Sequence, residues 1–253
     1  MDLSGKTVVI TGGTGGIGSA LAVAFRGAKA EVVTADLPGT GADMEVDVTD
    51  AEAMAAALSG LDALDVVVAN AGIGVAGSVD DIDRAGWEAS IDVNIRGVVN
   101  TVLPAYQRLR DQGSGTIVLM GSLSGLVGTP LLTPYSMTKH AVVGLAASLR
   151  PEAARHGVGV VVVCPGPIET PLLDSPVATP GMSVRRHLTN AAGPAMSPEA
   201  LATAVVEAVA KDRPQLVPGR AKLIARLARW APKAIDGQLA KGMHEELAAA
   251  RAH

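Results

Sequence analysis

The chain has 253 residues, of which 48% are hydrophobic and only 2% aromatic, and its formal net charge at pH 7 is −4. This slightly acidic balance gives no general attraction for nucleic acid. The single cysteine, Cys164, excludes an intramolecular disulfide bond. The sequence has neither the roughly 18 uninterrupted apolar residues of a membrane-spanning helix nor the start of a secretory signal. We therefore expect a cytoplasmic protein.

Short valine-rich runs alternate with alanine-rich stretches, which predicts parallel strands covered by helices. The expected strands span residues 6–11, 31–35, 43–48, 65–69, 116–120, 158–163 and 215–217. The expected helices span residues 17–26, 51–58, 87–109, 134–155 and 198–211. Pro104 should kink or break the third helix, and the unbroken β-branched run at 158–163 predicts a central strand. The chain is thus expected to form an α/β fold, a single-domain doubly wound parallel sheet (Rossmann-like) with helices on both faces, over residues 1–253.

Residues 165–198 are rich in proline and small residues without a sustained period, which predicts a mobile insertion beside the substrate site. Residues 172–198 should line or cover the substrate site, with an apolar supply from Leu172, Leu173, Val177, Met182, Val184 and Leu188. Met182 and Met196 are suited to adapt to bulky apolar ligands. The basic cluster Arg185, Arg186 and His187 has two interpretations: contact with a substrate carboxylate or phosphate, or solvated loop charge.

Residues 220–253 form a C-terminal extension with two expected helices, at 220–232 and 235–250. In the first, apolar side chains fall on one stripe and basic ones on other positions. The stripe contains Leu223, Ile224, Leu227 and Trp230, and the basic residues are Lys222, Arg226 and Arg229. The favoured interpretation is packing over the cleft or at a subunit contact. Attachment to an anionic membrane surface is the alternative.

A glycine-rich turn, Thr11–Gly18, lies between the first strand and the first helix. Gly13, Gly15 and Gly18 have the G-x-G-x-x-G spacing, while Gly12, Gly16 and Gly18 match T-G-x-x-x-G-x-G. Such a turn suits a pyrophosphate at a helix N-terminus. An ordinary flexible turn is the alternative. Asp36 ends the second strand, where an acid accepts hydrogen bonds from an adenosine ribose and repels a 2′-phosphate. Because neither Thr14 nor Leu37 offers a cation, NAD is favoured over NADP.

Tyr135 and Lys139 are four residues apart on an expected helix, so their side chains share one face. A phenol has a pKa of about 10, and a nearby cation lowers it. Such a pair can move a proton to or from an alcohol or carbonyl oxygen. An incidental surface pair is the alternative.

Together with Asn70-Ala71-Gly72, Asn94 and Ser122, these motifs make residues 5–220 resemble a classical short-chain dehydrogenase/reductase. The resemblance implies a homo-oligomer, either a dimer or a tetramer. It also implies a cofactor site in which glycines hold the diphosphate, Asp36 the ribose, and the loop after the sixth strand the nicotinamide. The implied cofactor-binding residues are Gly12, Thr14, Gly16, Ile17, Gly18, Asp36, Asp47, Val48, Asn70, Ala71, Gly72, Tyr135, Lys139, Pro165, Gly166, Ile168 and Thr170. For Asp47, adenine contact and a solvated loop acid are both open.

The resemblance also implies catalytic roles. Tyr135 is the general acid/base, and Lys139 binds the nicotinamide ribose and lowers the tyrosine pKa. Ser122 hydrogen-bonds the substrate oxygen, whereas the neighbouring Ser124 is out of register. Asn94 holds a water that links Lys139 to solvent.

We expect an NAD-dependent oxidoreductase that transfers a hydride between the cofactor and a secondary alcohol or ketone. The oily insertion suggests an apolar, steroid-, retinoid- or acyl-chain-like substrate. One alternative is a 3-oxoacyl thioester reductase of lipid synthesis, for which resembling enzymes usually use NADPH. Another is a non-catalytic nucleotide-sensing protein. We expect neither a metal nor nucleic acid as a ligand.

Overall fold

The computed structural model describes residues 1–251, so the last two residues of the expected extension, 252 and 253, lie outside this range. Within it, one seven-stranded parallel sheet has the order β3-β2-β1-β4-β5-β6-β7. The strands are β1 Thr7–Thr11, β2 Glu31–Asp36, β3 Met44–Glu45, β4 Val66–Ala69, β5 Gly115–Met120, β6 Val158–Val163 and β7 Gln215–Leu216. The expected doubly wound, Rossmann-like sheet is confirmed.

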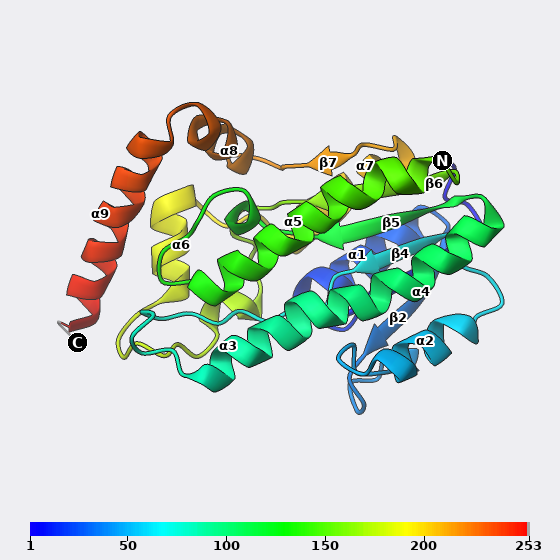
Figure 1. Cartoon of the computed structure of the whole chain (residues 1–253), viewed down its shortest axis with the longest axis horizontal. Coiled ribbons are helices and arrows are strands. Elements are labelled where there is room, and N and C mark those ends of the chain that lie inside the picture. Colours follow the sequence, from blue (N-terminus) through cyan, green and yellow to red (C-terminus); the bar gives the residue numbers. More distant parts are fainter. Residues whose placement is uncertain (252–253) are drawn as a thin grey trace.

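Helices cover both faces of this sheet (Figure 1). The longer ones are α1 Gly16–Gly27, α2 Ala51–Ser59, α4 Gly97–Gln112, α5 Thr133–Ala154 and α7 Pro198–Ala210. One hydrophobic core joins α2, α4 and α5 to the sheet, and a second joins α1 and α7 to the opposite face. Because both faces are covered, the strands are apolar throughout rather than alternating.

The position predicted for the sixth strand is wrong. β6 lies between β5 and the two-residue edge strand β7, and the middle of the sheet is β4. The unbroken run of β-branched residues in β6 reflects burial on two faces, which an interior strand has wherever it stands in the order.

The break expected at Pro104 is also wrong, because α4 continues through that residue. The irregularity lies earlier, in a π-helical turn, η1 Asp92–Arg96, which joins α3 Arg84–Ile91 to α4. Asn94 in this turn exchanges hydrogen bonds of 2.9 Å with both the backbone N–H and the carbonyl of Ile73. These two bonds fix the turn, and the sequence gives no local sign of them.

The segment after β6 contains more regular structure than expected. It has a 3₁₀ turn, η3 Pro171–Asp174, and a helix, α6 Val184–Ala192, whose first turn is capped by Ser183. Its two ends pair with each other, since Ile168 and Met196 form a parallel bridge. Glu169 N–H donates to the Met196 carbonyl, and Met196 N–H donates to the Pro167 carbonyl, both at 2.9 Å. The segment is therefore closed at its base.

The C-terminal extension forms the two expected helices, α8 Ala221–Trp230 and α9 Pro232–Arg251. At one end of the molecule, α9 contacts both α6 and α8 (Figure 1). Buried Glu246 of α9 accepts a hydrogen bond from Ser183 N–H at 2.8 Å and pairs with Arg186 at 2.6 Å. Among residues 1–251, no helix combines the length and apolar character needed to span a bilayer.

Candidate active site

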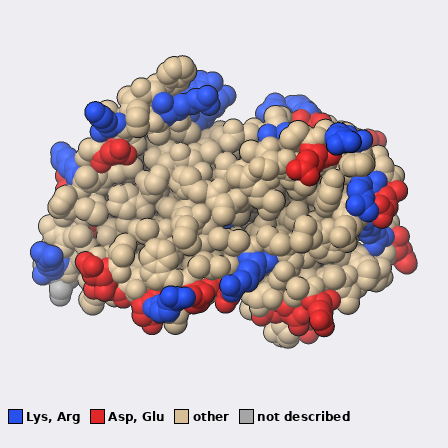
Figure 2. Space-filling view, viewed as in Figure 1, with Lys and Arg blue, Asp and Glu red and all other residues tan. Residues whose placement is uncertain are grey.

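A cavity of about 520 Å³ opens at the carboxyl ends of the strands. This is the edge of a parallel α/β sheet where ligands bind. On the face of the molecule drawn in Figure 2, most of the middle is uncharged and charged side chains gather around the margin. Of the catalytic and cofactor-binding residues expected from the sequence, all except Thr14 and Asn94 line the cavity.

The glycine turn forms one end of this cavity, and its backbone is closely packed. Gly12 has a φ of +62°, and a Cβ atom on Gly18 would lie 2.0 Å from the Gly12 carbonyl oxygen. Only glycine fits such a position without movement of the backbone. A Cβ on Gly16 would lie 2.8 Å from the Thr170 methyl group, so the loop after β6 rests directly on the turn.

Asn70 and Thr11 tie the turn to β4. The Asn70 side chain donates to the carbonyls of Thr11 and Gly12 at 2.9 and 3.1 Å. The buried Thr11 hydroxyl accepts from the N–H groups of Asn70 and Ala71 at 3.1 and 3.2 Å. Sequence reasoning placed Thr11 at the start of the turn but gave its hydroxyl no role. Its position as the last residue of a strand before the glycines was the available signal.

Asp36 lies at the rim of the cavity, beside the turn. One carboxylate oxygen accepts from both the N–H and the hydroxyl of Thr14, at 2.9 and 2.5 Å, and the other accepts from Leu37 N–H at 2.9 Å. Thr14 therefore orients the acid from outside the cavity. Among the described residues that line the cavity, Lys139 is the only lysine or arginine, so no cation stands next to Asp36.

Asp47 belongs to the loop after β3 and is bonded within it. Its carboxylate accepts from the N–H and hydroxyl of Thr49, both at 2.8 Å. The Val48 carbonyl accepts from Asn100 at 2.9 Å. These bonds fit the interpretation of Asp47 as a loop acid, while its contact with adenine stays a prediction.

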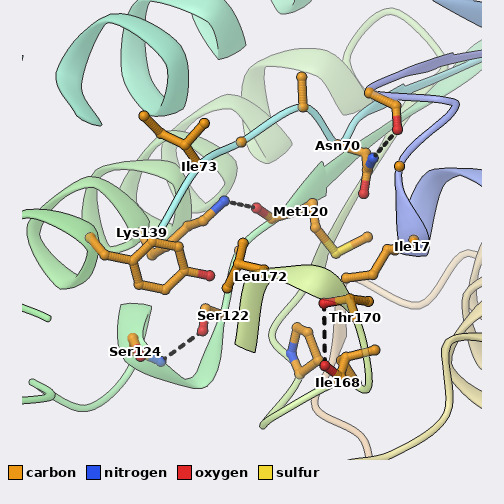
Figure 3. Close-up of a pocket in the computed structure, with 18 of the residues that line it drawn as sticks. Ile17, Asn70, Ile73, Met120, Ser122, Ser124, Lys139, Ile168, Thr170 and Leu172 are labelled. Atoms are coloured by element: carbon orange, nitrogen blue, oxygen red, sulfur yellow. Dashed lines mark hydrogen bonds between the residues drawn. The ribbon is translucent and has the colours of Figure 1, made fainter. Parts of the chain in front are cut away.

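Three polar side chains, Lys139, Tyr135 and Ser122, line the cavity together. Figure 3 shows Lys139 and Ser122 in its wall. Lys139 and Tyr135 lie one turn apart on α5, with the Lys139 ammonium 5.5 Å from the centre of the Tyr135 ring. The ammonium donates to the Met120 carbonyl at 2.9 Å. Ser122 follows β5, and its oxygen accepts from Ser124 N–H at 3.1 Å. An incidental surface pair is therefore excluded.

Ser124 also lines the cavity, but its hydroxyl is already engaged. It accepts a hydrogen bond from the Thr129 hydroxyl at 2.9 Å. Hydrogen bonding with the Ser122 side chain, by contrast, acts on Tyr135 and lowers its pKa. Ser122, and not Ser124, is thus the serine that acts on the Tyr135 phenol.

Burial dominates the ionisation of this group of residues. It raises the pKa of Tyr135, and Ser122 offsets only part of that rise. It lowers the pKa of Lys139 from 10.5 to about 8. The expected net lowering of the tyrosine pKa is therefore wrong for the polypeptide alone, because desolvation disfavours the phenolate more than its neighbours stabilise it.

Asn94 lies behind the cavity wall and is fully buried. Besides Ile73, its amide donates to the Thr138 hydroxyl at 3.1 Å, and Thr138 donates in turn to the Tyr135 carbonyl at 2.8 Å. A Cβ on Gly72 would lie 3.0 Å from the Asn94 oxygen and 3.4 Å from the Lys139 ammonium. Asn94 and Lys139 thus approach the same backbone position from different helices. Thr138 was missed by sequence reasoning, because only the fold shows that it is buried.

The far end of the cavity is apolar. Leu172, Leu173 and Leu188 line it as expected, but Val177, Met182 and Val184 do not, and they pack with α9 in a separate cluster instead. Several lining residues were missed because they come from distant parts of the chain. They include Ile73, Leu123, Val127, Leu132 and Leu239.

The basic cluster does not line the cavity, and its members bind other parts of the protein. Arg185 pairs with Glu169 and Asp174, at 2.7 and 2.6 Å, and lowers the pKa of Asp174. Arg186 pairs with Glu246 as described above. His187 is buried, with its ring nitrogen 2.9 Å from the Pro130 carbonyl, and burial lowers its pKa. Neither these residues nor Met196 line the cavity.

The sheet, the glycine turn and the cavity at the strand ends place the chain among the Rossmann-like α/β proteins. Residues 6–180 match the family model described as short chain dehydrogenase, and the chain belongs to this family.

Curated relatives and solved structures agree with this assignment. An acetoacetyl-CoA reductase of Synechocystis sp. is 37% identical over 179 residues, which cover 67% of this chain and 75% of the relative. A 2-(S)-hydroxypropyl-CoM dehydrogenase of Xanthobacter autotrophicus is 32% identical, covering 81% and 89%. A crystal structure of a short chain dehydrogenase/reductase from Burkholderia phymatum, in complex with NAD, has a TM-score of 0.79 and 26% identity, covering 92% and 96%.

Proposed function

We propose that this member of the family is an NAD-dependent oxidoreductase that interconverts an apolar secondary alcohol and its ketone. The observation that carries the proposal is the meeting of Tyr135, Ser122 and Lys139 in the cavity that also contains the glycine turn and Asp36. A proton-transfer group and a dinucleotide-binding edge in one cavity are what hydride transfer to a carbonyl requires.

The residues present fit a dinucleotide. The turn before α1 presents backbone N–H groups for a diphosphate, and Asp36 is held by Thr14 with its carboxylate at the cavity rim. Asn70, Ala71 and Gly72 support this edge, and Asp47 and Val48 flank the adenine end. Pro165, Gly166, Ile168 and Thr170 form the wall for the nicotinamide. The bound cofactor supplies the hydride acceptor or donor.

The proton is handled by side chains of the chain itself. Because the pKa of Tyr135 is raised, the phenol is protonated at neutral pH and donates a proton to the carbonyl oxygen during reduction. During oxidation the same group must first lose its proton, which alkaline pH favours. Ser122 holds the substrate oxygen, and Lys139 contacts the nicotinamide ribose. Asn94, behind Lys139, holds a water that connects it to solvent.

The substrate is bound by the apolar far end of the cavity, between segment 165–198 and the C-terminal helices. Leucine, valine and isoleucine side chains form its wall, and Lys139, beside Tyr135, is the only lysine or arginine that lines the cavity within residues 1–251. A steroid-, retinoid- or acyl-chain-like body fits this surface better than a substrate with a free carboxylate or phosphate.

A 3-oxoacyl thioester reductase is the second candidate, and the acetoacetyl-CoA reductase of Synechocystis sp. favours it. The thioester reductases that this chain resembles usually use NADPH. The Asp36 carboxylate would repel the 2′-phosphate of that cofactor. Titration with both reduced cofactors separates the two candidates. Tight binding of NADPH with weak binding of NADH would favour the thioester reductase.

The direct test is a panel of secondary alcohols with NAD at alkaline pH, followed by NADH absorbance. Turnover of apolar members supports the proposal. Cofactor binding without turnover of any alcohol or ketone would favour a nucleotide-sensing protein instead. From family membership we also propose a cytoplasmic homo-oligomer, a dimer or tetramer, which sedimentation of the purified protein distinguishes.

A further inference from the structure

Helix α8 has three separate stripes of side chains, and two of them face solvent. The inner stripe of Ala221, Ile224, Ala225 and Ala228 packs on Leu123 and Val127, next to the cavity. The second stripe is apolar but exposed: Leu223 is 62%, Leu227 45% and Trp230 83% accessible. The third contains Lys222, Arg226 and Arg229, also exposed. Of the four apolar residues expected to pack over the cleft, only Ile224 does so, and the other three are exposed.

The charge around α8 has one sign. Between Asp212 and Asp236 the sequence has no acidic residue and six basic ones, in a chain whose net charge is −4. The basic residues are Arg213, Arg220, Lys222, Arg226, Arg229 and Lys233. Within residues 1–251, none of these six forms an ion pair with an acidic side chain. Lysine and arginine atoms flank an uncharged projection where α8 lies (Figure 2).

A second copy of the chain is a poor occupant for this face. In a two-fold contact the same patch meets itself, so unpaired cations would face cations while the tryptophans and leucines were buried. An anionic lipid surface has the opposite properties. It attracts the basic stripe, and its headgroup layer accepts the exposed tryptophan and leucines.

We propose that the exposed face of α8 docks on an anionic lipid surface, with Leu223, Leu227 and Trp230 inserted among the headgroups and the basic stripe on the lipid phosphates. The helix would lie in the plane of the interface and would not cross the bilayer. Its opposite stripe forms part of the cavity wall, since Ile224 lines the cavity. On the basis of the proposed function, docking would place the substrate end of the cavity at the membrane, where apolar alcohols and ketones accumulate.

The first experiment uses no substrate or cofactor. Full-length protein is sedimented at low salt with vesicles of phosphatidylcholine, with or without phosphatidylglycerol. Wild type should bind the anionic vesicles only, and added salt should weaken binding. R226Q/R229Q should weaken it about fivefold for each cation removed, and L227S/W230S at least tenfold. The matched controls, R155Q and V23S, change an exposed cation and an exposed apolar residue elsewhere and should bind like wild type.

Three results would overturn the proposal. These are no binding of the wild type at low salt, equal loss in the control variants, or self-association through Trp230 without vesicle binding. All these variants change exposed side chains, and equal melting temperatures would show that they fold.

A second experiment presents an apolar alcohol within anionic vesicles and a short soluble alcohol in buffer. L227S/W230S should lose kcat/KM only for the vesicle-borne alcohol. Failure of every alcohol to react would reject the proposed function and leave the vesicle-binding result standing. Equal kcat/KM of variant and wild type in vesicles would reject membrane delivery.

Discussion

The Lys139 ammonium donates a hydrogen bond of 2.9 Å to the backbone carbonyl of Met120, which joins α5 to the end of β5 beneath the cavity. Lys139 is only 4% exposed. The bond fixes the side chain, but one carbonyl does not replace the hydration of an ammonium, so burial lowers the pKa to about 8. The positive charge on the buried Lys139 ammonium therefore lowers the stability of the native state.

Replacement of Lys139 by methionine should raise the free energy of unfolding at pH 7, by up to roughly 3 kcal/mol. Between pH 8 and 10.5 the unfolded lysine binds more protons than the native one, so the wild type gains stability relative to the variant and the difference shrinks. Urea unfolding of both proteins as a function of pH measures this difference in the free energy of unfolding. The control Lys211→Met alters an exposed residue and should change stability little. A difference that is constant across this pH range would contradict the prediction.

Tyr135→Phe should lower kcat by about 10² to 10⁴ because the proton donor is lost, while cofactor affinity stays unchanged. Stopped-flow turnover and cofactor titration measure the two effects. Tyr106, the other tyrosine, lies on α4 against the core and not on the cavity, so Tyr106→Phe is the matched control. Near wild-type turnover in Tyr135→Phe would remove the assignment.

The rate of oxidation should increase with pH above neutrality, since burial raises the pKa of Tyr135 and the base form appears only on the alkaline side. Reduction should be favoured at neutral pH, where the phenol holds its proton. Initial rates in both directions over a pH series measure this. Parallel pH profiles for the two directions would argue against Tyr135 as the proton carrier.

Asp36→Ser should weaken NADH binding roughly tenfold or more, because hydrogen bonds to a charged acceptor are lost, and should improve NADPH binding. Fluorescence titration with both cofactors gives the ratio. Asp62→Ser removes the same charge from an exposed loop and should leave the ratio unchanged. If the NADH to NADPH ratio is the same in Asp36→Ser and wild type, Asp36 does not select the cofactor.

Two glycines of α1 give a further matched pair. Gly18→Ala would place a Cβ 2.0 Å from the Gly12 carbonyl oxygen. It should lower the free energy of unfolding by about 1–3 kcal/mol and also weaken cofactor binding. Gly27 has open space around its Cβ position, so Gly27→Ala should be neutral or slightly stabilising. Thermal melts with and without NAD measure both. Similar losses in the two variants would show that the close approach is not what restricts Gly18.

The features predictable from the sequence were those encoded locally. Strand positions followed from β-branched runs, and the Tyr135–Lys139 pair from the spacing of one helical turn. Asn94 shows the limit: it interrupts a helix through bonds to Ile73, far away in sequence. Likewise, α6 is anchored by Glu246 from α9, and the pKa of Tyr135 depends on burial that only the complete fold produces. Features that depend on such distant partners were missed or given the wrong sign.

The Ile168–Met196 bridge closes segment 169–195 at its base, and this affects how the sequence of the segment can change in evolution. The chain departs from the sheet edge and comes back to the same point, with hydrogen bonds at 2.9 Å on either side of the gap. Insertions, deletions or exchange of whole stretches inside the closed segment need not disturb the strand before it or α7 after it. A gene encoding this chain can therefore change much of this segment, apart from Thr170 against the glycine turn, while the sheet and the turn are kept.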